Sequence, residues 1–397
     1  MKLPKFGIKN SPKIKKNKND SGYVVIDLTS TSVKALSFVP QSDEKLMIKG
    51  VSVADSYNDK MRREAIENTV KECLIQSNSN AKEAIVGLGG PNVFGFILIA
   101  KIKREDSEKQ ITEKEMDEIY MKIKNVAEEQ AGKRWNAHFA NESKFEPLDL
   151  VVTAIYIDEK AVSEPVGETG EDLKISVFSS YSEEKYYKWA MNMLGQLKFS
   201  SLTVTTTMYS QVKLLSEVDK NFILVDVGKD CTEVSVILGK NIIQSRSFDM
   251  GGAYFSDYLA DKTGSSFIDS NGKKEAYSLN TLNSDESDKI GDYLYDAGKS
   301  WCTAFSVVLS TMTGIKSFPH VIYITGGGAN MSLLEELLYE DDWHKSIPFA
   351  QEISIKHADY NLLKKHIDDE LKILSDLRMF TPASLGLIKL ELDEANE

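Results

Sequence analysis

Two apolar segments of this 397-residue chain each end in an aspartate and then run into a short polar turn. The first covers residues 23–27 and ends at Asp27, and the second covers residues 222–226 and ends at Asp226. Short apolar runs bounded by turn residues predict buried strands, each leading through a tight turn into a second strand. A carboxylate at the end of a buried strand is costly unless something there requires its charge. The alternative is that each aspartate only bonds the amides of its own turn.

A third signal is the glycine run 326–328, which follows an apolar segment at 321–325 and precedes a helical pattern. A glycine pair, Gly251 and Gly252, likewise opens a predicted helix, and a helix N-terminus suits the approach of a phosphate group. The chain has no Walker A sequence and no G-x-G-x-x-G fingerprint with a following acid, which excludes the P-loop and Rossmann classes. The two hairpins and the glycine turn predict a nucleotide clamp, with the hairpins at the phosphates and the turn beneath the base.

The candidate ligands of such a nucleotide come mostly from these turns. Asp27 and Asp226 would hold Mg²⁺ between themselves and the phosphates, usually through water. Hydroxyl and backbone amide groups of the turns are suitable phosphate donors. Lys274 and Glu275 would contact the ribose or the base, unless they form only a solvated charged turn. The other candidates are Ser30, Thr31, Ser32, Gly228, Lys229, Thr232, Gly251 and Gly252 at the phosphates, and Gly326, Gly327 and Gly328 at the adenosine.

Charge and composition restrict the class of partner. A net charge of −12 argues against a nucleic-acid-binding protein. Residues 1–19 depart from this balance, because they contain seven lysines and no acid. This arm is either a disordered, solubilising tail or a segment attracted to an anionic membrane surface, at about 1 kcal/mol per lysine. Widely spaced cysteines, no signal peptide and no apolar run of about 20 residues predict a reducing, cytoplasmic location.

The chain divides into five predicted parts. One of them interrupts the first lobe and is a small α/β unit of helix, strand, turn, strand and helix. Its first helix is predicted to be capped by Thr112, with Glu115 three residues later. The parts are a lysine-rich arm at 1–21, the first part of the first lobe at 22–100, the inserted domain at 101–198, the remainder of both lobes with the nucleotide site at 199–390, and an acidic tail at 391–397.

These motifs resemble those of the bacterial actin-like ATPases. The stretch from Asp27 to Lys34 is similar to the family's first phosphate motif, which adds Lys34 as a candidate ligand. Residues 226–233 are similar to the second phosphate motif, and residues 325–329 to the adenosine motif. The segment 162–175 is similar to a segment of the domain inserted in the FtsA branch. The resemblance implies an α/β fold of the actin-like (ribonuclease H-like) two-lobed ATPase type with a small inserted α/β domain.

The resemblance covers about residues 23–390 and implies ATP and Mg²⁺ as cofactors, with at most weak ATPase activity. An FtsA-like protein of this kind is a division adaptor that polymerises and links FtsZ or other division proteins to the inner face of the cell membrane. The alternative is a PilM-like component of type IV pilus assembly, or an actin-like scaffold without nucleotide turnover. A sugar or acetate kinase on the same fold would leave the inserted domain unexplained.

Several positions depart from the family's pattern. Thr29 stands where the family has glycine, so a Cβ lies where the backbone would approach phosphate. Asp230 would repel phosphate, although Lys229 beside it would offset that charge, and Glu233 replaces an aspartate one methylene shorter. Hydrolysis is therefore less well supported than binding. The acidic tail does not match the amphipathic membrane helix of FtsA, so the lysine-rich arm or a membrane partner would provide the attachment.

Overall fold

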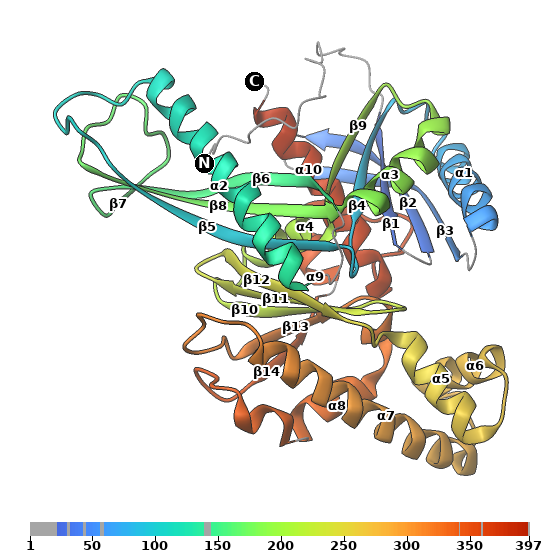
Figure 1. The fold of residues 1–397 in the computed structure, drawn as a ribbon. Coiled ribbons are helices and arrows are strands. Elements are labelled where there is room, and N and C mark those ends of the chain that lie inside the picture. The colour runs from blue at the N-terminus through green and yellow to red at the C-terminus, as the bar shows by residue number, and fades with distance from the viewer. Residues whose placement is uncertain are drawn as a thin grey trace.

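The computed structural model describes residues 22–395 except 30–31, 43–44, 56–58, 139–143, 341 and 359. Two β-sheets with helices between and outside them form the described part of the chain, so the predicted α/β class is confirmed (Figure 1). The strand orders are β15-β3-β2-β1-β4-β9 and β14-β13-β10-β11-β12-β5-β8-β6-β7. The lysine-rich arm, Ser30, Thr31 and the last two residues of the acidic tail lie outside the described residues.

The first sheet is built around a strand that is buried along its whole length. Val24 and Ile26 face a core shared with the outer helices, whereas Tyr23 and Val25 face a core between the two sheets. A strand covered on both faces reads as a continuous apolar run, which is why β1 stands out in the sequence. The elements of this part are β1 (Tyr23–Leu28), β2 (Ser32–Ser42), β3 (Lys45–Asp55), α1 (Asp59–Gln76), β4 (Glu83–Leu88), α3 (Glu184–Leu194), η1 (Gly195–Leu197), β9 (Ser201–Thr206) and β15 (Ile367–Asp368).

The second sheet repeats this plan. Strand β10 has an antiparallel hairpin partner, β11, and a parallel neighbour, β13, just as β1 has β2 and β4. The strand registers of the two hairpins also correspond: Asp27 lies opposite Lys34, and Asp226 lies opposite Glu233. The elements are β10 (Phe222–Val227), β11 (Thr232–Leu238), β12 (Asn241–Phe248), α5 (Gly252–Thr263), α6 (Phe267–Ser278), α7 (Ser284–Ser310), β13 (Val321–Thr325), η2 (Gly327–Asn330), α8 (Ser332–Glu340), η3 (Asp342–Ser346) and β14 (Ser354–His357).

Helices α4 (Thr207–Leu215) and α10 (Phe380–Ala395) lie between the two sheets. The core there joins side chains of both sheets to these helices, for example Val25, Leu224 and Leu385. The two short elements α9 (Tyr360–Leu363) and η4 (Leu377–Met379) lead into α10. None of the described helices is long and apolar enough to cross a lipid bilayer.

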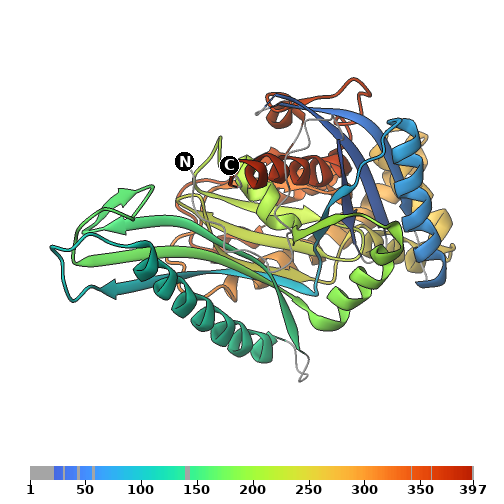
Figure 2. The ribbon, with the colours of Figure 1, turned by 90° about the horizontal axis from the view of Figure 1, so that it is seen from above.

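A projecting arm continues the second sheet beyond β12 (Figure 2). It consists of β5 (Val93–Lys103), α2 (Glu113–His138), β6 (Phe145–Ile157), β7 (Lys160–Val162) and β8 (Asp172–Glu183), which we call the inserted unit. Gln244 of β12 pairs with Phe96 of β5 and joins the unit to the sheet. The cap of α2 is confirmed, since the Glu115 N–H donates to Thr112 Oγ1 at 3.2 Å. Strand pairing of this unit starts at β5, ahead of residue 101, and the predicted domain boundaries stay a prediction.

Candidate functional site

A cavity of about 600 Å³ opens between the two hairpins and the glycine turn. It contains most of the residues that the sequence nominated, although they come from segments far apart in the chain. Of the nominated residues, the cavity wall includes Asp27, Ser32, Lys34, Asp226, Gly228, Lys229, Gly252, Lys274, Glu275, Gly326, Gly327 and Gly328.

Two described candidates are not part of the wall. Thr232 is fully buried, where its hydroxyl donates to the Met250 carbonyl at 2.7 Å and accepts from Trp301 Nε1 at 3.0 Å. Gly251 lies behind the second hairpin, where a Cβ would stand 2.4 Å from the Lys229 carbonyl oxygen. Glycine at this position therefore permits close packing of the hairpin on the start of α5.

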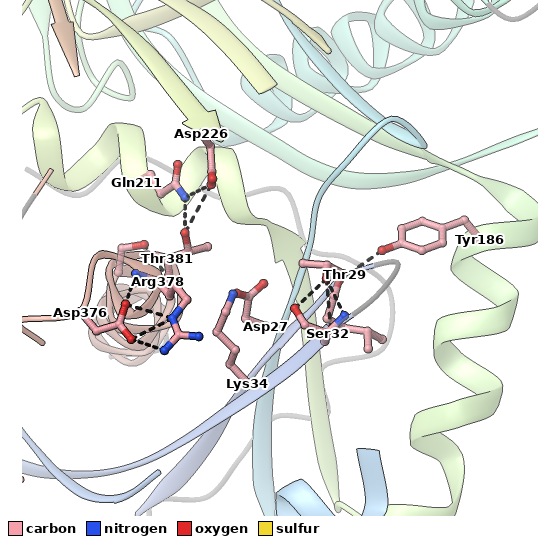
Figure 3. Close-up of polar contacts among 12 residues, drawn as sticks. Asp27, Thr29, Ser32, Lys34, Tyr186, Gln211, Asp226, Asp376, Arg378 and Thr381 are labelled. Atoms are coloured by element: carbon pink, nitrogen blue, oxygen red, sulfur yellow. Dashed lines mark hydrogen bonds and ion pairs between the residues drawn. The ribbon is translucent and has the colours of Figure 1, made fainter. Parts of the chain in front are cut away.

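In the first hairpin, Lys34 points at the strand-end carboxylate (Figure 3). Its Nζ lies 2.6 Å from Asp27 Oδ2, and Asp27 is only 1% exposed. The other carboxylate oxygen, Oδ1, is buried and has no hydrogen-bond partner within the described residues. Thr29 closes the turn through its hydroxyl, which accepts from the Ser32 N–H at 3.0 Å. A buried oxygen without a donor leaves one open coordination position at the cavity.

In the second hairpin, the equivalent carboxylate is held by neutral groups. Gln211 Nε2 donates to Asp226 Oδ2 at 2.7 Å and to Thr381 Oγ1 at 2.6 Å, as Figure 3 shows. Burial raises the pKa of Asp226, against the lowering effect of the Gln211 hydrogen bond. Its cross-strand neighbour is an acid, not a base, and burial together with the Asp226 charge raises the pKa of Glu233 to about 8. The pair Asp226 and Glu233 is thus favoured when one of the two carboxyls is protonated or when a cation binds beside them.

The glycine turn packs directly on the end of β10. Gly326 has φ +85°, and a Cβ there would lie 2.3 Å from Asp226 Oδ1. A Cβ on Gly328 would lie 2.3 Å from Val227 Cγ1. Both positions need glycine for close approach, and the turn forms part of the cavity wall beside Arg378.

The far end of the cavity contains the α6 candidates. Lys274 Nζ donates to the Gly252 carbonyl at 2.7 Å, and burial lowers the pKa of Lys274 to about 8. Glu275 is exposed and accepts from Asn271 Nδ2 at 2.9 Å. Lys274 thus contacts the first turn of α5, while the Glu275 carboxylate remains open to solvent and to a ligand.

Sequence reasoning missed several polar side chains of the site region, and four of them pair with Asp226 or with each other. Gln211 and Thr381 hold Asp226, and Arg378 pairs with Asp376 at 2.6 Å at the wall near Gly327. They belong to α4 and to the segment that begins α10, neither of which carries a nucleotide-binding pattern. Among the described residues, no group of three or more His, Cys, Asp or Glu side chains is arranged to hold a metal ion.

Two solved structures show what this architecture is similar to. A chain of the PilM-PilN type IV pilus biogenesis complex matches with a TM-score of 0.64 at 13% identity, over 94% of this chain and 99% of that chain. The chain has the actin-like ATPase fold. The diol dehydratase-reactivating factor in its nucleotide-free form matches this actin-like fold with a TM-score of 0.50 at 9% identity, over 95% and 100% of the two chains. No family model and no curated protein matches the sequence.

Proposed function

We propose that this protein is an actin-like adaptor that binds ATP with Mg²⁺ in the cavity between its two hairpins and uses it as a conformational or polymerisation switch. One observation carries the proposal: the repeated β-hairpins bring Asp27 and Asp226 to the same cavity, and the glycine turn lines that cavity as well. The volume of about 600 Å³ lies within the roughly 300–1,000 Å³ of small-molecule sites.

The charges of the wall fit a nucleotide that arrives with a divalent cation. Six acidic and four basic side chains line the cavity, so its formal charge is negative before any phosphate enters even when Glu233 is protonated. Mg²⁺ would offset this charge, held through water by Asp27 and Asp226, and the unpartnered Asp27 Oδ1 is an available acceptor. Ser32, Gly228 and Lys229 would contact the phosphates. The adenosine would lie along Gly326–Gly328, with Lys274 and Glu275 at its outer end.

The cellular role that we propose first is that of an FtsA-like division adaptor, which self-associates and links FtsZ to the inner face of the cell membrane. The inserted unit supports it, because a projecting arm offers a contact surface outside the nucleotide cavity. The second candidate is a PilM-like role in type IV pilus assembly, and the likeness to a chain of the PilM-PilN complex favours it. Calorimetry with an FtsZ C-terminal peptide and with an N-terminal PilN peptide separates the two roles. Attachment through residues 1–21 is tested by flotation with anionic vesicles, with and without that arm.

Mg-ATP titrated into the full chain is expected to bind with micromolar affinity. Asp226→Ala is expected to raise the dissociation constant at least about tenfold, or 1.4 kcal/mol, because the cation loses one of its two strand-end carboxylates. Isothermal titration calorimetry measures both values. Asp261→Ala is the matched control, since it removes an exposed aspartate of α5 that does not line the cavity. An absence of binding at millimolar Mg-ATP would contradict the proposal and favour a scaffold without a nucleotide.

A further inference from the structure

Helix α4 contacts the inserted unit at one end and the cavity residues along its length. At its start, Asp149 of β6 is buried and accepts from Thr205 Oγ1 at 2.7 Å and from the Thr206 N–H at 3.0 Å. These bonds cross from the inserted unit to β9, the strand that runs directly into the helix. Such donors hold a buried carboxylate firmly. If one donor is lost, no solvent is present to replace its hydrogen bond to the charged group.

The first turn of α4 has two further contacts that fix its direction. Thr206 is the N-cap, and its hydroxyl accepts from the Tyr209 N–H at 3.1 Å. The Tyr209 ring stacks on Phe178 of β8, with centroids 5.8 Å apart and an interplanar angle of 9°. The inserted unit therefore contacts the start of the helix through both a charge and an aromatic ring.

The middle of α4 contacts two residues of the cavity wall, Asp226 and Thr381. Gln211 is 1% exposed, and its amide spans Asp226 and Thr381, as described above. Ser210 bonds Ser384 of α10 at 2.9 Å, so this part of the helix also has a fixed neighbour. Gln211 lies five positions after Thr206, a little more than one helical turn, so the helix fixes the position of one relative to the other.

We propose that α4 makes Asp149 and Gln211 positioning residues for the Asp226 carboxylate, so that the state of the inserted unit sets the geometry of the second hairpin. A partner bound to the inserted unit would then alter the cavity, and a cavity ligand would alter the inserted unit by the same factor. The consequence for ATP affinity rests on the proposed function, whereas the mechanical link does not. The helix acts as one rigid element between two hydrogen-bonded ends.

Hydrogen–deuterium exchange on the ligand-free full chain tests the link. Thr205→Val removes the hydroxyl that bonds Asp149 across the boundary and keeps the side-chain shape. It is expected to speed amide exchange in the turn 227–232 by about fivefold, the lower end of typical coupling between sites. The matched control is Thr153→Val, the same substitution on β6, which removes a 3.2 Å bond to the Ser176 carbonyl within the inserted unit and leaves the bonds of Asp149 intact. That control is expected to leave the turn unchanged, and Thr205→Ser is expected to restore the slow exchange.

Equal exchange of the turn in the Thr205→Val and Thr153→Val variants, or no recovery in Thr205→Ser, would overturn the inference. If Thr205→Val does not fold, Gln211→Met tests the link from the other side, because coupling is reciprocal. It should speed exchange at 145–152 of the inserted unit, and unchanged exchange there would equally overturn the link. Calorimetry of Mg-ATP is run separately, so that a failure of nucleotide binding does not count against the helix.

Discussion

Replacing Trp301 by alanine is expected to lower the free energy of unfolding by about 4 kcal/mol, in line with large-to-small changes in protein cores. Trp301 is fully buried in α7, stacks on Phe305 at 5.6 Å and lies 5.8 Å from Phe248. Its indole N–H also donates to Thr232, the first residue of β11. The alanine variant would therefore contain an unfilled cavity, and the buried Thr232 hydroxyl would lose one hydrogen-bond partner.

Guanidinium unfolding of the full chain measures this loss, and Trp301→Phe is the matched control. Phenylalanine keeps most of the packing and removes only the indole N–H, so it is expected to cost about 1 kcal/mol. A cost for Trp301→Ala below about 1 kcal/mol would show that α7 is not packed on β11 as described. The result matters for the cavity, because β11 forms half of the second hairpin.

A second large effect is expected from Glu233→Gln, and it depends on pH. In the folded chain the pKa of Glu233 is about 8, against an ordinary value of 4.5. Between pH 4.5 and pH 8 the folded state therefore binds one proton more than the unfolded state. Stability must then fall as pH rises through that window, with the full cost present above pH 8. Glutamine carries no charge, and the variant is expected to equal the wild type near pH 5 and to exceed it by about 2 kcal/mol at pH 8.5.

Denaturant unfolding at a series of pH values provides the two curves. Glu275→Gln is the control, because its carboxyl belongs to the same cavity but is exposed. Parallel curves for Glu233→Gln and the wild type would mean that Glu233 is solvated, against the burial described here.

The parts of the fold that the sequence predicts best are those where local pattern and burial agree. Strands β1 and β10 are buried on both faces, so each is an apolar run that can be recognised from the sequence alone. Helix α2 shows the limit of periodicity: Met116, Ile123 and Val126 are apolar at near-helical spacing, and Met116 and Ile123 are buried, but Val126 is 43% exposed. The neighbouring sheet determines which face of a helix is buried. The helical period alone does not define where that buried face ends.

The site shows a different limit. Thr232 was nominated as a turn residue, but β11 already begins there, and strand alternation places it on the same face as Val234 and the α7 core. Gln211 had no signal at all, because its role arises only when α4 is laid between the two sheets. A hairpin carboxylate is visible in the sequence, whereas the groups that hold it come from elsewhere in the chain.

The joint between β12 and β5 has a mechanical consequence. Within the described strands, β12 and β5 are paired at one position, between Gln244 and Phe96. Ser245 adds side-chain contacts, since its hydroxyl lies 3.1 Å from both the amide nitrogen and the carbonyl oxygen of Gly95. By contrast, β5 and β8 are paired along the whole of β5, from Val93 to Lys103. A tensile force between the inserted unit and the second lobe would therefore concentrate at that one pair. The unit would separate as an intact sheet while the hairpins around the cavity kept their own strand pairing.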